Sequence, residues 1–263
     1  MMNEPGPGPR TPGSVFGAFI IGDEILSGKR QDKHLAKAIE ILKARGLELS
    51  WVHYLGDEPQ RITAEFRRSL ATGDIVFSFG GIGATPDDYT RQCAAAALDV
   101  PLQQHPEAVK EIVARFGAAA YPRRVLMAEF PVGCDIIPNP YNRIAAFSVG
   151  NHHFLPGFPE MAWPMMEWVL ETRYAHLFHQ TPSAEEIIIV KNAGESDLFD
   201  IMNRIVADYP DLKLSSLPQF VQFGRIIELS VRGNPASVPR AMQEIKTSIG
   251  ALGFPFDVKQ NKP

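Results

Sequence analysis

The chain has 263 residues, which is enough for one large domain or two domains of ordinary size. Hydrophobic residues make up 45% and charged residues 21%, close to the average of soluble globular proteins, so disordered, collagen-like and coiled-coil classes are excluded. The formal net charge of −4 argues against a general nucleic-acid-binding protein. No apolar run reaches the ~18 residues that a membrane-spanning helix needs.

The amino-terminal residues and the cysteines indicate a cytoplasmic protein. Residues 1–13 contain four prolines and three glycines but neither a basic start nor an apolar stretch, so they predict a flexible tail and no signal peptide. Cys93 and Cys134 lie far apart and have no Cys or His partner at metal-ligand spacing, which predicts buried free thiols. We expect neither a membrane nor a nucleic acid as partner.

Residues 14–98 predict three strand–loop–helix units, which imply a parallel sheet with helices on both faces. The strand segments are almost continuously apolar, the pattern of strands buried on both faces, and they span residues 14–21, 47–55 and 74–79. The first helix is expected to follow Asp32 as N-cap, and the second to start near Pro59. Their predicted buried positions are Leu35, Ala38, Ile39 and Leu42 in the first helix and Ile62, Phe66 and Leu70 in the second.

The remaining pattern completes two domains. A helix over 106–116, a short strand over 135–137, a hairpin of 144–149 and 152–155, and a helix over 159–171 complete an α/β domain at 14–173, a three-layer αβα fold with a mostly parallel sheet. Residues 174–184 are interpreted as a linker. Residues 185–263 predict a small α+β domain of βαββαβ order, with strands at 186–190, 213–215, 221–232 and 255–258 and helices at 195–208 and 235–249.

The loop of residues 80–90 carries the strongest functional signal. Gly80, Gly81 and Gly83 follow a buried strand, where glycines let the backbone approach a ligand and expose N–H groups to anionic oxygens. We expect Thr85 to be the N-cap of the next helix, whose positive N-terminus favours phosphate or pyrophosphate.

Acidic residues follow all three strands. Asp87 and Asp88 stand beside the glycines, Asp23 and Glu24 follow the first strand, and Asp57 follows the second. Because ligands bind at the carboxyl ends of parallel strands, these acids are candidates for a divalent metal, a base or recognition of a ring N–H. Four of them also have a purely structural explanation, since Asp23, Glu24 or Asp57 can cap a turn and Thr85 with Asp88 has capping-box spacing.

The histidines favour a structural role. His152 and His153 are adjacent in a strand and point to opposite faces, so they do not chelate one ion easily. His176 and His179 lack a carboxylate or thiol partner nearby in the sequence. We interpret all four as solvated or packing side chains.

The glycine loop resembles the MoaB/Mog fold, the molybdopterin-binding domain of molybdenum-cofactor synthesis. Within that superfamily the chain is most similar to the amino-terminal part of the competence/damage-inducible protein A (CinA) family. The resemblance covers residues 15 to about 172, and the small carboxyl-terminal domain resembles the one that follows in that family. Its supporting motifs are Gly22-Asp23-Glu24-Ile25-Leu26-Ser27-Gly28, Gly56-Asp57-Glu58-Pro59, Pro138-Asn139-Pro140 and Leu155-Pro156-Gly157-Phe158-Pro159.

The resemblance implies an oligomer, a dimer or trimer, that binds a phosphorylated pterin or nucleotide. It implies that Asp88 and Asp57, with Asp87 beside them, are catalytic residues of a metal-dependent pyrophosphatase acting on ADP-ribose-like compounds, with Asp23, Asp87 and Asp88 holding Mg²⁺, Mn²⁺ or Co²⁺. Longer relatives carry an amidohydrolase domain for nicotinamide mononucleotide, which we expect to be absent. The residues expected to bind the ligand or its phosphate are Gly22, Asp23, Glu24, Ser27, Gly28, Gly80, Gly81, Gly83, Thr85, Thr90, Asn139, Pro156 and Gly157.

Departures from the family pattern fall in the second half of the domain, at Leu126, Met127, Asn142, Arg143 and Met161. Where the family has a glutamate, this chain has Met161, and Glu160 stands one position early, a rotation of about 100° on a helix. Three hypotheses follow: a metal-dependent pyrophosphatase, a pterin or nucleotide carrier without turnover, and an oligomeric interaction module.

Overall fold

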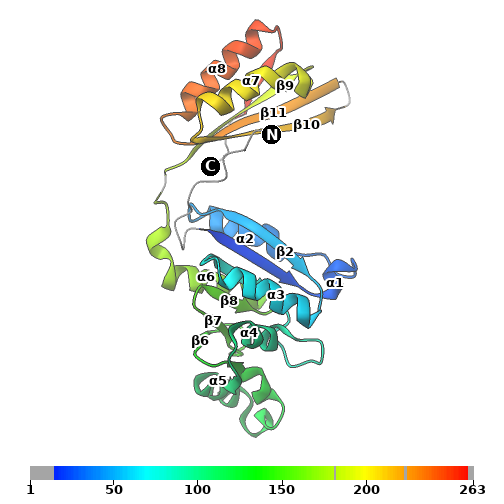
Figure 1. Ribbon diagram of the computed structural model, residues 1–263, viewed down its shortest axis with the longest axis vertical. Coiled ribbons are helices and arrows are strands. Elements are labelled where there is room, and N and C mark those ends of the chain that lie inside the picture. Colours follow the sequence, from blue (N-terminus) through cyan, green and yellow to red (C-terminus); the bar gives the residue numbers. More distant parts are fainter. Residues whose placement is uncertain (1–14, 181, 222–223, 260–263) are drawn as a thin grey trace. The chain divides into compact units, whose positions relative to one another are not determined.

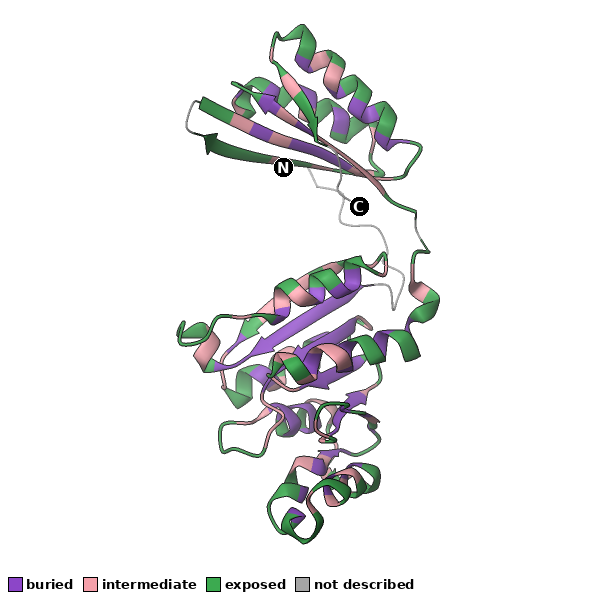
Figure 2. Cartoon of the chain, turned by 180° about the vertical axis from the view of Figure 1, so that it is seen from behind, coloured by how far each residue is buried: buried purple, intermediate pink, exposed green. Residues whose placement is uncertain are grey.

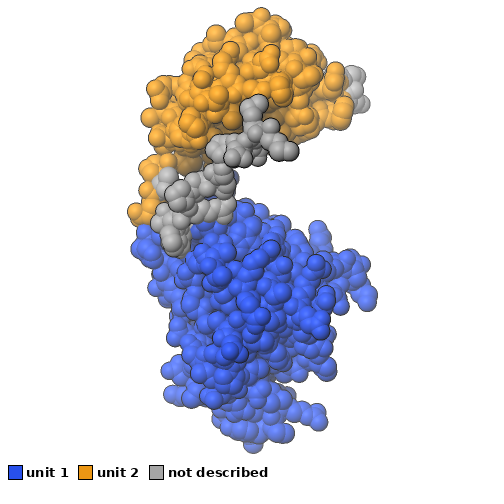
Figure 3. All heavy atoms as spheres, viewed as in Figure 1, with its two compact units in different colours: residues 1–178 blue, residues 179–263 orange. Residues whose placement is uncertain are grey.

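The computed structural model describes residues 15–180, 182–221 and 224–259, so the tail expected at 1–13 lies outside the described residues. The chain divides into two compact units with the boundary between Phe178 and His179, inside the segment interpreted as a linker (Figure 3). Within the described ranges, no helix is both long enough and apolar enough to span a membrane.

The first unit begins with strands and helices largely in alternation, and four consecutive strands precede its last α-helix (Figure 1). Its strands are β1 (Phe16–Ile21), β2 (Leu49–Leu55), β3 (Ile75–Phe79), β4 (Leu102–Gln104), β5 (Glu129–Pro131), β6 (Asp135–Ile137), β7 (Ala146–Val149) and β8 (His152–Leu155). Its helices are α1 (Asp23–Leu26), α2 (His34–Lys43), α3 (Pro59–Leu70), α4 (Thr90–Leu98), α5 (Pro106–Phe116) and α6 (Pro159–Arg173). Short 3-10 helices are η1 (Gly117–Ala120), η2 (Arg124–Ala128) and η3 (Ala175–Leu177).

The main sheet has six strands in the order β2-β1-β3-β8-β7-β6. The pairs β1–β2, β1–β3 and β3–β8 are parallel, whereas β7 runs antiparallel to both of its neighbours. A separate two-stranded sheet joins β4 and β5. The mostly parallel sheet and the hairpin of β7 and β8 confirm the predicted α/β fold.

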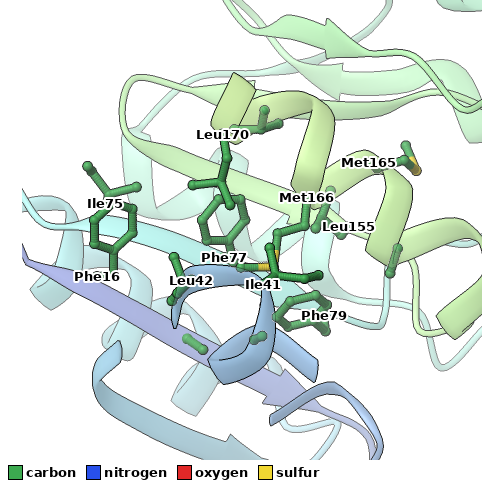
Figure 4. Close-up of a cluster of buried hydrophobic side chains, with 14 of the residues drawn as sticks. Phe16, Ile41, Leu42, Ile75, Phe77, Phe79, Leu155, Met165, Met166 and Leu170 are labelled. Atoms are coloured by element: carbon green, nitrogen blue, oxygen red, sulfur yellow. The ribbon is translucent and has the colours of Figure 1, made fainter. Parts of the chain in front are cut away.

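Each central strand is apolar because it contributes to two cores. In β1, Phe16 and Ile20 pack under α2 and α6, while Phe19 and Ile21 pack under α3, α4 and α5. Figure 4 shows the first of these cores, where Phe77 and Met166 come from β3 and α6. The predicted three-layer αβα arrangement is therefore confirmed.

Two predicted core positions in the first helices are wrong. Ile39 is 45% exposed, and Ile41 takes the buried position beside Leu42 in α2. Leu70, in the last turn of α3, is only partly buried, and Ser69 is buried there instead. Both residues lie where a hydrophobic periodicity admits two neighbouring phases, and tertiary packing selects one of them.

The second unit is a two-layer sandwich. Its elements are β9 (Ala184–Lys191), α7 (Glu195–Asp208), β10 (Leu212–Val221), β11 (Gly224–Gly233), α8 (Val238–Ala251) and β12 (Phe256–Lys259). The antiparallel sheet has the order β10-β11-β9-β12, and both helices bury their apolar sides against it, which confirms the βαββαβ prediction (Figure 2). Strand β10 is longer than the 213–215 predicted, because it pairs with β11 over its whole length although its end is exposed.

Candidate functional site

A pocket of about 740 Å³ lies where the strands β1, β2, β3 and β8 end. Each strand delivers a loop to its wall, as expected at the carboxyl edge of a parallel sheet. Among its lining residues are these predicted ligand or catalytic residues: Gly22, Glu24, Asp57, Gly80, Gly81, Gly83, Thr85, Asp87, Asp88, Asn139, Pro156 and Gly157.

The start of the glycine loop needs glycine for conformation and for space. Gly80 and Gly81 have φ of 102° and 68°, a region that other residues rarely adopt. A Cβ on Gly80 would lie 2.3 Å from the carbonyl oxygen of Ile21, and one on Gly81 would lie 2.4 Å from Thr90 Oγ1. Thr90 is buried and does not line the pocket, but its Oγ1 donates to Gly80 O at 2.9 Å and its N–H to Gly81 O at 3.0 Å.

Several consecutive N–H groups of the loop have no hydrogen-bond partner among the described residues. The N–H of Gly80 already donates to Leu155 O at 3.0 Å, and the N–H of Thr85 donates to Asp88 Oδ2 at 2.9 Å. Among the hydrogen bonds between described residues, none uses the N–H of Gly81, Ile82 or Gly83. The N–H of Ala84 has no partner there either, so the donors without a partner are those of residues 81–84, whereas the N–H groups of Gly80 and Thr85 are engaged within the protein.

The prediction that Thr85 caps the next helix is wrong. Helix α4 begins at Thr90, and residues 85–88 form a turn in which the Asp88 N–H donates to Thr85 O at 3.0 Å. The Thr85 hydroxyl also donates to Asp88 Oδ2, so Asp88 closes this turn in the manner of a capping box. Asp88 therefore stabilises the loop through one carboxylate oxygen while it also lines the pocket.

Asp23 and Asp57 hold two loops together. The Asp57 N–H donates to Asp23 Oδ1 at 3.1 Å, and the Asp23 N–H donates to Asp57 Oδ2 at 2.9 Å. Asp23 is not among the pocket-lining residues, whereas Asp57 is. Partial burial raises the pKa of Asp57 above its ordinary value, and the charge of Asp23 adds to that effect.

A ready-made metal centre is absent from the described residues, because no three His, Cys, Asp or Glu side chains lie close enough to share an ion. The expected set of Asp23, Asp87 and Asp88 does not converge, since Asp23 is engaged with the loop of Asp57. The residues present therefore do not fit a divalent metal by themselves.

Ser27 and Gly28 are exposed and do not line the pocket. Asn139 lines the pocket. Its Nδ2 donates to Ile144 O at 3.0 Å, and its Oδ1 accepts from the Tyr141 N–H at 3.0 Å. Asn139 thus shapes the 139–144 turn.

The same part of the pocket includes residues at which we expected a departure from the family pattern. Met127, Asn142 and Met161 line the pocket there, and Asn142 Nδ2 lies 2.9 Å from Met161 Sδ. Leu126 and Arg143 do not line it; Arg143 instead pairs with Glu111 at 2.7 Å. This side is consequently more apolar than the glycine-loop side.

Sequence reasoning missed the basic residues of the pocket. Lys29 and Arg30 line it. They directly follow Ser27 and Gly28, which the sequence predicted as binding residues instead. Arg30 also lies with its guanidinium carbon 6.0 Å from the ring centre of Phe158, another lining residue. In the sequence, two adjacent cationic residues in a loop after a strand are the feature that indicates this basic lining.

Arg91 was also missed, and it links the glycine loop to the segment of residues 126–129. It is 3% exposed, and its guanidinium donates to Gly83 O at 2.6 Å, Leu126 O at 2.6 Å and Glu129 O at 3.0 Å. Burial lowers its pKa. An arginine within an alanine-rich buried helix was the sequence signal.

The hairpin histidines are packing residues, as expected. His152 is hydrogen-bonded to Ser69 Oγ at 2.8 Å, and burial lowers its pKa to about 4. His153 contacts Ser148 Oγ and Tyr174 OH, each at 2.8 Å. His176 and His179 are exposed, and Cys93 and Cys134 are buried free thiols, which confirms those predictions.

The domain that holds this pocket is similar to known proteins. The model of the family described as "Probable molybdopterin binding domain" matches residues 17–176. A CinA-like protein of Anaeromyxobacter sp. (strain K) is 34% identical over 157 residues, covering 57% of this chain and 38% of that protein. A protein of Caldivirga maquilingensis is 28% identical over 244 residues, covering 89% of this chain and 93% of its own length. The crystal structure of the protein CinA, with unknown function, from Thermoplasma acidophilum is 26% identical with a TM-score of 0.56, over 61% of this chain and 98% of that one.

Proposed function

Because the chain belongs to the probable molybdopterin binding domain family, we propose that it binds a phosphorylated pterin or nucleotide in the pocket at the strand ends. The observation that carries the proposal is the run of backbone N–H groups at residues 81–84, which have no partner among the described residues and belong to residues that line a ligand-sized pocket. Successive N–H groups of this kind hold phosphate oxygens. Lys29 and Arg30 add positive charge to the same pocket.

The test compares two glycines with similar backbone conformations. Gly81 has φ of 68° and a Cβ there would lie 2.4 Å from Thr90 Oγ1, whereas Gly28 has φ of 73° and nothing within 4 Å of a Cβ. Calorimetric titration with pyrophosphate and ADP-ribose should show at least tenfold weaker binding in Gly81→Ala and unchanged binding in Gly28→Ala. Equal affinities in the two variants would contradict the proposal.

A second candidate is pyrophosphate hydrolysis, the activity that the resemblance implies. It is favoured by Asp57, a carboxylate that lines the pocket and whose pKa is raised above its ordinary value by burial. The pocket supplies Asp57 and Asp87 but no three-residue metal centre among the described residues, so we derive no metal-dependent step.

The measurement is AMP release from ADP-ribose with Mg²⁺, Mn²⁺ and Co²⁺ added in turn. Turnover that Asp57→Asn abolishes, with ADP-ribose binding retained, would support hydrolysis. Binding without AMP release at high protein concentration would leave a carrier of the ligand as the function. Absence of any ligand-induced rise in Tm would favour the interaction module instead.

We also propose that the protein forms a homo-oligomer, as the resemblance implies. Exposed apolar side chains in the first unit support this, among them Tyr121 at 58% and Tyr141 at 67% exposure. Light scattering on the purified chain distinguishes a monomer from a dimer or trimer.

A further inference from the structure

Strand β2 is an open edge of the main sheet. It pairs with β1 on one side, and among the described residues no strand pairs with its other side. Its seven residues, Leu49–Leu55, include no proline and no Lys, Arg, Asp or Glu. Along such an edge, alternate residues direct their backbone N–H and C=O groups outward, where an added strand can pair with them.

The other outermost strands of the two larger sheets are protected against such pairing. Strand β6 has three residues, one of them the exposed Asp135, and β12 has four residues, among them Asp257 and Lys259. Strand β10 is longer, but it contains Lys213 and Pro218. Short length, charges and prolines are the usual means by which proteins block the pairing of sheet edges. Strand β2 has none of them, so its edge is open to strand addition.

A cavity of about 200 Å³ lies beside this edge. Trp51 and His53 of β2 line it together with Glu65 and Arg68 of α3, and Asp74, directly before β3, completes the charged part of its lining. No residue of this cavity lines the pocket of the glycine loop. An added strand next to β2 directs every second side chain to the face of the sheet on which the cavity lies.

The Trp51 indole is held in a fixed position within this cavity. It lies across Gly17 of β1, where a Cβ would come within 2.1 Å of the indole ring, so a larger residue there would displace it. Its Nε1 donates to Asp74 Oδ2 at 2.9 Å, and Phe19 packs against it with the ring centres 5.2 Å apart. The indole is also partly exposed, and an exposed aromatic ring attracts cations.

The charged groups of the cavity favour a cationic side chain as its occupant. Glu65 pairs with Arg68 at 2.6 Å and lies 3.2 Å from His53 Nδ1. Asp74 accepts from the neutral indole of Trp51 and forms no ion pair with another described residue. The carboxylate without a cationic partner is therefore that of Asp74. A guanidinium or ammonium group beside Asp74 and Trp51 interacts favourably with both.

We propose that the edge of β2 binds an extended segment of another protein by strand addition, with an arginine or lysine side chain of that segment in the cavity. Backbone hydrogen bonds to β2 supply affinity that depends little on sequence, and the cavity selects the cation through Asp74 and Trp51. The site shares no residue with the glycine-loop pocket, so the proposal does not depend on phosphate binding.

The test is calorimetry on the full chain with the peptide acetyl-Thr-Val-Thr-Arg-Thr-Val-Thr-amide and with versions that carry norleucine or glutamate in place of arginine. The arginine peptide should bind at least tenfold more tightly than the norleucine peptide, and the glutamate peptide should bind most weakly. Asp74→Asn keeps an acceptor for the Trp51 indole but removes the charge, so it should abolish most of the preference for arginine and leave norleucine-peptide binding unchanged. The control Asp135→Asn, on the opposite edge strand β6, should change none of the affinities.

Strand addition is tested separately with N-methylated versions of the arginine peptide. N-methyl groups on alternate residues along one edge of the peptide should abolish binding, because they block the backbone hydrogen bonds to β2. The same groups along the other edge should leave binding intact.

Three results would overturn the proposal. The first is equal affinity for the arginine, norleucine and glutamate peptides, or binding that N-methylation along either edge leaves intact. The second is the absence of binding by every peptide at millimolar concentration. The third is a dimer, measured by light scattering, that the arginine peptide does not dissociate and that Ser50→Lys converts to a monomer by placing a charge on β2; it would assign the edge to a second copy of the chain.

Discussion

The two sides of the main pocket are built by different means. The glycine-loop side is backbone: its shape follows from positive φ angles and from N–H groups that side-chain changes leave in place. The opposite side is made of side chains, among them Met127, Asn142 and Met161. A site made of backbone N–H groups is retained when the side chains facing it change, so the two sides of the pocket can vary separately.

The same contrast explains why binding is better supported than turnover. The proposed phosphate site uses successive backbone N–H groups, and those of residues 81–84 have no partner among the described residues. Hydrolysis needs side-chain groups arranged around the rest of the ligand, and there the chain has Met161 in contact with Asn142.

Removing Arg91 should have the largest effect, because this residue links the glycine loop to the segment of residues 126–129. In Arg91→Met the carbonyls of Gly83, Leu126 and Glu129 lose buried donors, which we expect to lower the free energy of unfolding by roughly 3–5 kcal/mol. Urea denaturation measures this. The control Arg67→Met, an exposed arginine that donates to Ala96 O, should change stability by less than about 1 kcal/mol. Equal losses in both variants would show that Arg91 is not the link.

Acid should weaken β8, the strand that leads to Pro156 and Gly157. Burial lowers the pKa of His152 to about 4, so between pH 6.5 and 4 the unfolded chain binds more protons than the folded one. Above pH 6.5 the ionisation of His152 does not lower the free energy of unfolding. About 3 kcal/mol of that free energy is lost as the pH falls toward 4. Urea midpoints across this range should decline less steeply in His152→Asn, whereas the exposed His176→Asn should retain the slope of the original chain.

Truncating Met161 should affect ligand binding only at the side of the pocket that is made of side chains. We expect Met161→Ala to weaken ADP-ribose binding by up to about tenfold, because it removes apolar contact area, and to leave pyrophosphate binding unchanged. Calorimetry with both ligands measures the difference. An equal loss for pyrophosphate would mean that the two sides do not act separately.

Neutralising Asp57 should have the smallest effect on stability. Its folded pKa is raised, so its ionisation opposes folding as the pH rises from 3.8 through that higher value. Asp57→Asn should therefore give a small rise in Tm at pH 7 that disappears at pH 3, measured by thermal scans at both pH values. A lower Tm at pH 7 would mean that the hydrogen bond from the Asp23 N–H outweighs the charge.

Much of the fold could be predicted because hydrophobic patterns are local. The apolar runs of β1 and β3 predicted strands buried on both faces. Gly80 and Gly81 indicated a backbone conformation that only glycine adopts without strain. Where two phases of a pattern compete, as at Ile39 and Ile41, the sequence alone does not choose between them.

By itself, the sequence determined the αβα and βαββαβ architectures and the place of the glycine loop at a strand end. Tertiary structure alone decided which groups of that loop are available, because Leu155 takes the N–H of Gly80 and Asp88 takes both donors of Thr85. It also decided that Asp23 pairs with Asp57 instead of joining Asp87 and Asp88. The physical reason is that each polar group forms its hydrogen bonds with whatever the fold brings beside it, and those partners lie up to tens of residues away in the chain.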